Sequence, residues 1–408
     1  MGNKHYFNYF SPCLSEWRDF HFLEENDLRI HDANEIINQE KYNKLRLAMI
    51  NNDTSSKELD RCKMCTMFNN AGSRCSREWS NYYYEDIFDD IMDNLNDDGT
   101  LKDPNKIFYV HLSYTNVCNY KCRYCEPERS SALTAEFKAL NKEQNYIVDK
   151  DKKEFFKKDL FNKWKPKILN TRLIHFTCSG ESLLTQENID ILNFLIDNNK
   201  TDVHLLYNTN LSVRYFNNVD IFDLWKKFKK VIVLVSAEGL DPYNKIIKGS
   251  PVPFNVVLDN MKLLRKMPNV ILNVHSTYGA HNFLHLPAFH KALYNEGVIK
   301  ANEFYLNPLF QDPESVQIYP TYMKKKAESI YLNHIKWLDS IVDEDHIVNF
   351  YFNKSKIEYE NAIKFMYAAD KSHQIKDYIK NYLDIDKYRV VNSFELEELK
   401  MLKLHTTG

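Results

Sequence analysis

The chain has 408 residues, with 54 basic and 56 acidic side chains and a formal net charge of −2. This balance argues against a surface built to attract nucleic acid or anionic lipid, and the length allows one large domain with a smaller one, or two modest domains. No apolar run approaches the roughly 20 residues that cross a bilayer, and the N-terminus carries no targeting signal. We therefore expect a cytoplasmic protein without nucleic-acid or membrane partners.

The first predicted region, residues 1–100, contains four of the eight cysteines. In a reducing cytosol, closely spaced thiols are more often metal ligands or catalytic groups than disulfides. A helix is predicted over 34–51, where apolar residues recur at helical spacing. The polar stretch 96–105, which contains Gly, Pro and several Asp residues, is typical of a linker.

From residue 107 onward, short apolar runs alternate with amphipathic stretches. The predicted strands are 107–113, 172–177, 202–208, 231–236, 269–277 and 303–309. The predicted helices between them are 186–198, 254–266 and 284–294. This alternation predicts an α/β fold with a parallel sheet and helices outside it, and such sheets gather functional groups at the carboxyl ends of their strands. The remaining region, 321–408, is predicted to be a helical extension.

Three cysteines follow the first predicted strand, in the segment Cys118-Asn-Tyr-Lys-Cys122-Arg-Tyr-Cys125. Thiolates at this spacing can ligate three irons of a cubane cluster and leave the fourth iron without a protein ligand. The alternative is a structural zinc site that a distant Cys or His completes. Either interpretation makes this loop a metal site.

The pattern Cys-x3-Cys-x-aromatic-Cys, in a chain of six α/β units, resembles the radical S-adenosylmethionine (SAM) superfamily. The resemblance implies a partial (β/α)6 TIM-type barrel over 101–320 and a [4Fe-4S] cluster held by Cys118, Cys122 and Cys125. It also implies reductive cleavage of SAM to a 5′-deoxyadenosyl radical, which abstracts hydrogen from a substrate carbon. Tyr124 would then lie against the adenine, although a loop tyrosine can simply pack.

The segment after the second predicted strand, Cys178-Ser-Gly-Glu181, resembles the Gly-Gly-Glu motif of this superfamily. The resemblance implies that Ser179, Gly180 and Glu181 receive the methionine amino group, which suits a carboxylate. Ser179 departs from the family glycine. Cys178 is either a hydrogen donor to a product radical, which would make epimerisation feasible, or a small buried hydrophobic residue.

The later strand ends offer further cofactor contacts by the same resemblance. Asn210 closes a segment similar to Thr-Asn-Gly, and Ser236 and Glu238 stand where the family binds the ribose hydroxyls, with Glu in place of Asp. Lys248 stands at a family arginine, where it would meet the cofactor carboxylate unless it is a solvated lysine. Asn282 matches a family asparagine.

The N-terminal cysteines resemble those of the twitch-domain subgroup, in which a short form of the SPASM domain binds an auxiliary iron–sulfur cluster. The matching residues are Pro12-Cys13, Lys44-Leu45-Arg46, Cys62, Cys65, Gly72 and Arg77. Leu14 replaces a family cysteine and Cys75 replaces a family serine. We therefore expect a possible auxiliary cluster on Cys13, Cys62, Cys65 and Cys75, with a zinc-ribbon fragment as the alternative.

Together these resemblances imply an iron–sulfur enzyme that uses SAM, with an electron donor such as flavodoxin or ferredoxin. The oxidoreductase, epimerase and crosslinking types all remain open. There is a slight preference for a peptide or protein substrate over a sugar or small metabolite. The alternative from another class is a noncatalytic iron–sulfur or zinc protein for redox sensing or assembly, which predicts no SAM binding. A weaker similarity to the subgroup lies at 383–399.

Overall fold

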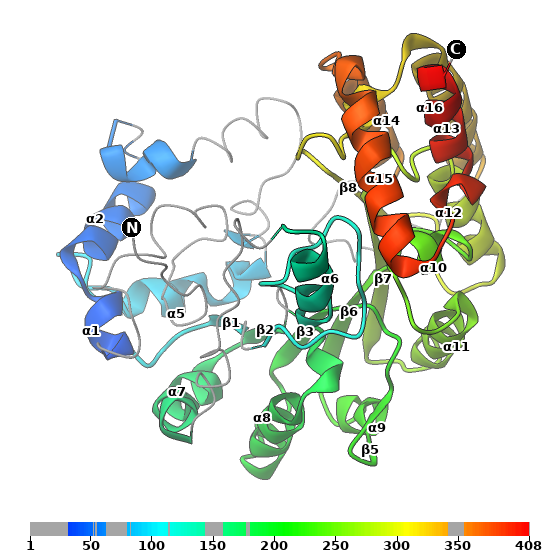
Figure 1. Ribbon diagram of the computed structural model, residues 1–408. Coiled ribbons are helices and arrows are strands. Elements are labelled where there is room, and N and C mark those ends of the chain that lie inside the picture. The colour runs from blue at the N-terminus through cyan, green and yellow to red at the C-terminus, as the bar shows by residue number, and fades with distance from the viewer. Residues whose placement is uncertain are drawn as a thin grey trace. The chain divides into compact units, whose positions relative to one another are not determined.

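The computed structural model describes residues 32–51, 53, 55–62, 80–81, 83–112, 115–142, 158–176, 180–341 and 355–407. The chain divides into two compact units. Figure 1 labels the helices and strands that are named below. Unit 1 takes the described residues up to 110 and 158–174, and unit 2 takes the others. Among the described residues no helix is both long and apolar enough to cross a membrane.

Unit 1 is built mainly of helices. They are α1 (Ala33–Ile37), α2 (Glu40–Ile50), the 3-10 helices η4 (Lys57–Cys62) and η5 (Glu85–Ile87), α5 (Phe88–Asp93) and α7 (Lys158–Asn170). The helix predicted over 34–51 is interrupted at Asn38. There the Asn38 side chain accepts from the backbone N–H of Leu101 at 2.9 Å and donates to its C=O at 3.3 Å. The prediction is therefore confirmed as two helices rather than one.

The segment 96–105 is a closed turn of unit 1. Leu95 and Leu101 form a β-bridge across it. The backbone N–H of Asn96 donates to the Thr100 C=O at 2.9 Å. Arg46 donates through Nε to the C=O of Gly99 at 2.7 Å. The prediction of a linker is therefore wrong, because the stretch folds as a turn inside unit 1, in which Asp98 and Asp103 accept from the backbone N–H groups of Thr100 and Asn105.

A parallel sheet of six strands carries the site, with its strands ordered as they follow in the chain. The strands are β1 (Tyr109–Leu112), β2 (Leu173–Phe176), β3 (His204–Thr209), β6 (Lys230–Ser236), β7 (Val270–Tyr278) and β8 (Phe304–Pro308). All six predicted strands are confirmed, as is the α/β fold class. Residues 231–235 are buried throughout, as expected of a strand covered on both faces.

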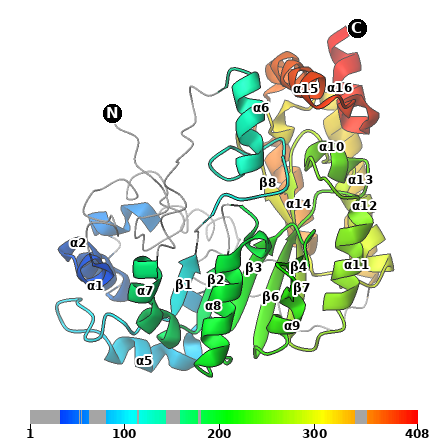
Figure 2. The ribbon, with the colours of Figure 1, turned by 60° about the horizontal axis from the view of Figure 1, so that its bottom comes forward.

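The helices of unit 2 lie outside this sheet (Figure 2). The predicted helices are confirmed as α8 (Gln186–Asp197), α11 (Phe254–Leu264) and α12 (Leu286–Asn295). Shorter elements were not predicted, namely α6 (Thr134–Ala139), the hairpin β4 (Tyr215–Phe216) and β5 (Val219–Asp220), α9 (Ile221–Trp225) and α10 (Tyr243–Ile247). The short 3-10 helices are η6 (Ser131–Leu133), η9 (Ser182–Leu184), η10 (Val316–Ile318), η11 (Ser372–Gln374) and η12 (Ser393–Glu395).

The predicted C-terminal helices are α13 (Thr321–Ser340), α14 (Ser355–Tyr367), α15 (Ile375–Arg389) and α16 (Glu397–Thr407). Helix α14 packs against both β8 and α13, and α15 packs against α16. Figures 1 and 2 show these helices gathered at the β8 side of the sheet. Since the strands are parallel, their carboxyl ends share one edge, and the loops at that edge carry the predicted site residues.

Candidate functional site

The cluster loop, residues 118–125, follows β1 and carries the three predicted ligands. Its thiols are free and partly buried. Within the loop, the N–H of Cys125 donates to the C=O of Cys122 at 3.0 Å. The backbone N–H groups of Lys121 and Arg123 donate to Lys248 and Ile247 at 3.1 and 2.9 Å. The loop is thus fixed to the segment that ends α10.

Iron binds cysteines as thiolates, and burial opposes thiolate formation in the metal-free loop. Burial raises the pKa of Cys118 and of Cys125 to about 12, and it also raises the pKa of Cys122. The free thiols are therefore protonated, and a cationic cluster would have to displace their protons. In a cubane cluster each of these thiolates would bind a different iron.

Gly180, which follows β2 in the chain, comes close to the segment before the cluster loop. Its φ is +77°, and a Cβ here would lie 2.5 Å from the C=O of Val117. The Gly180 N–H donates to Arg129 at 2.8 Å, and the Glu181 N–H donates to Val117 at 2.7 Å. Only glycine allows this close approach without a backbone shift.

The Glu181 carboxylate is buried and held by hydrogen bonds from β3 and η9. Its Oε1 accepts from Thr209 Oγ1 at 2.7 Å and from the Leu183 N–H at 3.2 Å, while Oε2 accepts from the Asn210 N–H at 2.7 Å. Burial raises the pKa of Glu181, although these hydrogen bonds oppose the shift. A buried carboxylate fixed in this way is a suitable acceptor for an ammonium group.

Asn210 connects the end of β3 to the cluster loop. Its Nδ2 donates to Asn119 Oδ1 at 3.0 Å, and its Oδ1 accepts from Ser212 Oγ at 2.7 Å. Asn119 in turn donates to Ser212 Oγ at 2.9 Å. This closed set of side-chain bonds fixes the loop against β3, so in this structure the Asn210 side chain has a structural role.

Lys248 and Glu238 form a buried ion pair, with 2.9 Å between Nζ and Oε2. Lys248 Nζ also lies 3.4 Å from the Tyr124 hydroxyl in the cluster loop. Burial alone would lower the pKa of Lys248, but Cys122 and Glu238 raise it well above its usual value. The two residues predicted as separate cofactor contacts are therefore partners of each other here.

Asn282 closes the loop that follows β7. Its Oδ1 accepts from the Gly279 N–H at 3.1 Å, and its Nδ2 donates to the C=O groups of Thr277 and Glu238 at 3.0 and 3.4 Å. Its amide therefore holds the ends of β6 and β7 together. Ser236, the last residue of β6, is half-buried and lies in register with His275 of β7.

Several predicted residues fall outside this description. Cys13, Cys65, Cys75, Cys178 and Ser179 are not among the described residues. Cys62 ends η4, but its side chain is also outside the described part. The auxiliary cluster and the hydrogen-donor role of Cys178 therefore stay predictions.

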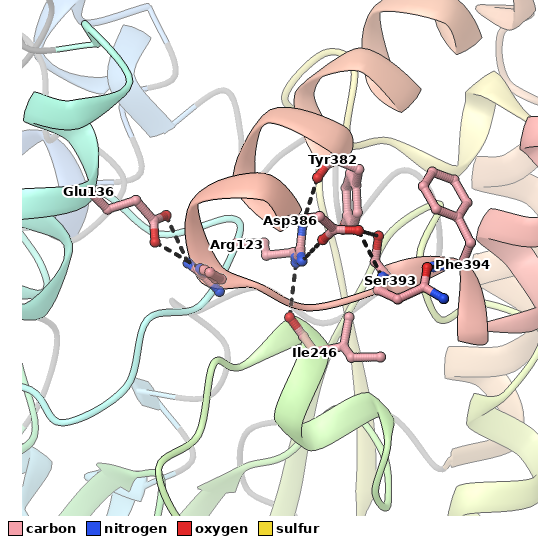
Figure 3. A network of polar contacts seen from close by, with 9 residues as sticks. Arg123, Glu136, Ile246, Tyr382, Asp386, Ser393 and Phe394 are labelled. Carbon is pink, nitrogen blue, oxygen red and sulfur yellow. Dashed lines mark hydrogen bonds and ion pairs between the residues drawn. The ribbon is translucent and has the colours of Figure 1, made fainter.

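Two polar residues at this edge were missed from the sequence. Arg123 stands inside the cysteine motif, yet the motif assigns that position no chemistry; it is buried and bonded to α15 (Figure 3). His281 is completely buried, with its ring parallel to that of Tyr124 at 6.0 Å between centroids. Its neighbour Asn282 was the only sequence signal nearby.

These observations define a class of α/β protein in which a parallel sheet presents a cysteine loop, buried carboxylates and a lysine at its carboxyl edge. The sequence model of the radical SAM superfamily matches residues 112–281. This part of the chain is a radical SAM superfamily domain. No curated protein matches the sequence.

Two solved structures have a similar fold. Native anSMEcpe with bound AdoMet is 16% identical, with a TM-score of 0.38, and the match covers 57% of this chain and 60% of that one. TYW1 with a lysine-pyruvate adduct bound is 11% identical, with a TM-score of 0.32, and the match covers 58% and 74%. This chain thus spans less than two thirds of the first structure.

Members of this superfamily use a [4Fe-4S] cluster and SAM and typically need a reductant and a substrate. Three observations fit these groups: the free thiols share one loop, Gly180 lets the Glu181 segment approach the backbone just before that loop, and Glu181 offers a buried carboxylate. Membership of the twitch subgroup stays a prediction.

Proposed function

We propose that this protein reductively cleaves SAM at a [4Fe-4S] cluster held by Cys118, Cys122 and Cys125, and removes a hydrogen atom from a substrate carbon. The observation that carries the proposal is the close approach at Gly180, which brings the start of the cluster loop beside the Glu181 carboxylate. Thiols for a cluster and an acceptor for the methionine ammonium thus belong to adjacent loops of one sheet edge.

Several residues of the chain have separate roles in this proposed reaction. When bound, the cluster supplies the electron that breaks the carbon–sulfur bond of SAM. Glu181 would accept the ammonium, because its carboxylate is already fixed by three donors. The buried ion pair of Lys248 and Glu238 places one positive and one negative charge at the site and adds no net charge. Tyr124 of the cluster loop contacts Lys248 through its hydroxyl.

Incubation with dithionite and SAM tests this proposal against the noncatalytic alternative. We expect 5′-deoxyadenosine, detected by mass spectrometry, from the reconstituted protein and none from a variant with all three cluster-loop cysteines changed to alanine. A fully loaded protein that neither forms 5′-deoxyadenosine nor binds SAM contradicts the proposal. It would favour the redox or assembly protein.

The substrate remains a peptide or protein in this proposal, on the similarity of the N-terminal cysteines to the twitch subgroup. If Cys178 donates a hydrogen atom to the product radical, the same carbon regains hydrogen and the reaction is an epimerisation. The Cys178 thiyl radical then returns to the thiol by taking an electron from the electron donor and a proton from solvent. The product formed in D2O should then carry one deuterium, and Cys178→Ala should abolish its formation but keep 5′-deoxyadenosine. A product without solvent deuterium would leave Cys178 a packing residue.

The auxiliary cluster on Cys13, Cys62, Cys65 and Cys75 is also proposed. Iron and sulfide should fall by about half in a variant that retains only the cluster-loop cysteines. Four irons in that variant and four in the unaltered chain would remove the auxiliary cluster from the proposal, with the main function untouched.

A further inference from the structure

We propose that helix α15 is a positioning element for the cluster loop, acting through Arg123 and Asp386, so that the C-terminal extension forms part of the cluster site. The inference rests on the proposed function, because it assumes that Cys122 and Cys125 are ligands. It adds a role for a region in which the sequence offered no usable motif.

Arg123 is the residue through which the cluster loop reaches α15. Its side chain is 0% exposed, and its guanidinium donates through Nη2 to Asp386 Oδ1. Nε donates to the C=O of Ile246 at 2.9 Å, and the guanidinium carbon lies 4.5 Å from the centre of the Tyr382 ring. Figure 3 shows Arg123 directed at α15. The planar group is therefore fixed by a carboxylate, a carbonyl and an aromatic face at once.

Asp386 is itself held in place from its other oxygen. Oδ2 accepts from the Ser393 N–H at 2.8 Å and from Ser393 Oγ at 2.7 Å (Figure 3). Ser393 belongs to the turn between α15 and α16 and is completely buried. The Asp386 carboxylate thus cannot rotate without breaking its contacts with both Ser393 and Arg123. Its fixed orientation therefore also fixes the orientation of the Arg123 guanidinium.

A second ion pair holds α15 beside the segment that follows the cluster loop. Arg389 donates through Nε and Nη2 to the two oxygens of Glu136 on α6, at 2.7 and 2.9 Å. Both side chains are nearly fully buried. Gly249 leaves room for this arginine, because a Cβ there would lie 2.9 Å from Arg389 Nη1 and 2.7 Å from the C=O of Lys121. Helix α15 therefore holds the chain at Arg123, within the cysteine segment, and at Glu136, after it.

Stability alone does not account for a buried charged pair. Apolar residues of similar volume often stabilise a core as well as a buried ion pair does, whereas the charged pair fixes orientation. Arg123 lies next to Cys122 and two residues from Cys125, so its direction sets where both thiols stand. Partners that orient metal ligands typically change metal affinity 10- to 100-fold when removed.

The test uses the full chain, reconstituted without oxygen. The rate of iron release to a chelator and the electron paramagnetic resonance spectrum of the reduced cluster, with and without SAM, are measured for Asp386→Asn and Arg123→Lys. We expect iron release about 10-fold faster than in the unaltered chain and a changed spectrum in both variants. Circular dichroism melting reports whether each variant is folded.

Arg265→Lys is the matched control. Arg265 makes a two-point pair with Glu303, at 3.2 and 2.8 Å, but Glu303 directly precedes β8 at the amino edge of the sheet. This variant loses the same kind of contact away from the cluster loop. It should release iron at the rate of the unaltered chain, even where its melting temperature falls.

The inference is overturned if Asp386→Asn and Arg123→Lys are folded, release iron at the unaltered rate and keep the same spectrum. If Asp386→Asn fails to fold, the double variant Arg123→Met with Asp386→Asn replaces it in the test, because this variant leaves no buried charge without a partner. Fast release from that double variant supports the inference, and unaltered release overturns it. Failure of the proposed function has a separate sign, since the unaltered chain, fully loaded with iron and sulfide, would then form no 5′-deoxyadenosine and bind no SAM.

Discussion

Position 180 requires glycine for two reasons: its φ is positive, and a Cβ would collide with the backbone of Val117. Changing Gly180 to alanine should destabilise the protein by more than about 2 kcal/mol, because an L-residue at positive φ costs roughly 1–2 kcal/mol and the Cβ also meets Val117. It should also weaken SAM binding. Urea denaturation and calorimetric titration measure the two effects.

Gly297 provides the control for this change, because it has a φ of +69° and nothing within 4 Å of its added Cβ. Gly297→Ala should show the conformational cost alone and leave SAM binding unchanged. Equal losses of stability in the two variants would contradict a role for the close approach at Gly180.

The buried pair Lys248 and Glu238 makes a second residue-scale prediction. Lys248→Met should cost about 3–5 kcal/mol of unfolding free energy, because it leaves the Glu238 carboxylate buried without a counter-charge. The double variant Lys248→Met with Glu238→Gln should recover much of that loss. Urea denaturation checks both; a double variant no more stable than Lys248→Met would show that the pair is not the cause.

The sequence predicted site residues unevenly at this scale. Cys118 and Glu181 stand in short patterns whose chemistry is local, so spacing and resemblance suffice to propose them. Arg123 takes its role from Asp386, which is 263 residues away in the chain. No local pattern can show a contact that only the packing of α15 creates.

At the scale of elements, predictability follows the length of the apolar pattern. Strand β6 is a buried run of Val, Ile and Leu, and α8 repeats its apolar residues at helical spacing, so both were predicted. Helices α9 and α10 have five residues each, too few for a period to show. The interruption at Asn38 depends on Leu101, a partner outside its own helix.

Helix α16 provides a prediction through Glu398, whose carboxylate accepts from the Tyr243 hydroxyl at 2.8 Å and from the His285 N–H, at the start of α12, at 3.1 Å. Burial raises the pKa of Glu398 to about 7 from 4.5. Between these values the folded state holds a proton that the unfolded state has released. The contribution to stability is therefore complete below pH 4.5 and is lost as the pH rises through about 7.

Glu398→Gln should remove this dependence. The unfolding free energy of the unaltered chain should fall by roughly 3 kcal/mol more than that of the variant between pH 4.5 and pH 7.5. Urea denaturation across this range measures it. The exposed neighbour Glu397 supplies the control, since Glu397→Gln removes only the smaller of the two causes that raise the pKa of Glu398 and should keep most of the dependence. Parallel curves for Glu398→Gln and the unaltered chain would contradict the raised pKa.

At the scale of the whole molecule, the alternation of strands and helices was enough to predict the α/β fold, because each βαβ step has few ways to pack. The division into units was less accessible. The chain passes from unit 1 to unit 2 within β1 and again within β2. A composition change marks a linker, but it cannot mark a boundary that falls inside buried strands.

The C-terminal extension is integral to unit 2, and a truncation tests this. Removing residues 396–408 deletes Leu396, Leu399 and Leu402, all at most 1% exposed, and leaves the partners of Glu398 without an acceptor. At about 2 kcal/mol for each buried leucine, the loss approaches the whole stability of a typical domain, 5–15 kcal/mol. We expect unit 2 to lose cooperative unfolding, measured by circular dichroism and calorimetry.

Truncation after Leu404 is the control, because it removes no buried side chain among the described residues. This variant should melt nearly as the full chain does. If the variant without residues 396–408 also melted as the full chain does, α16 would not contribute to the stability of unit 2. The packing of α15 on α16 could then not support the cluster loop.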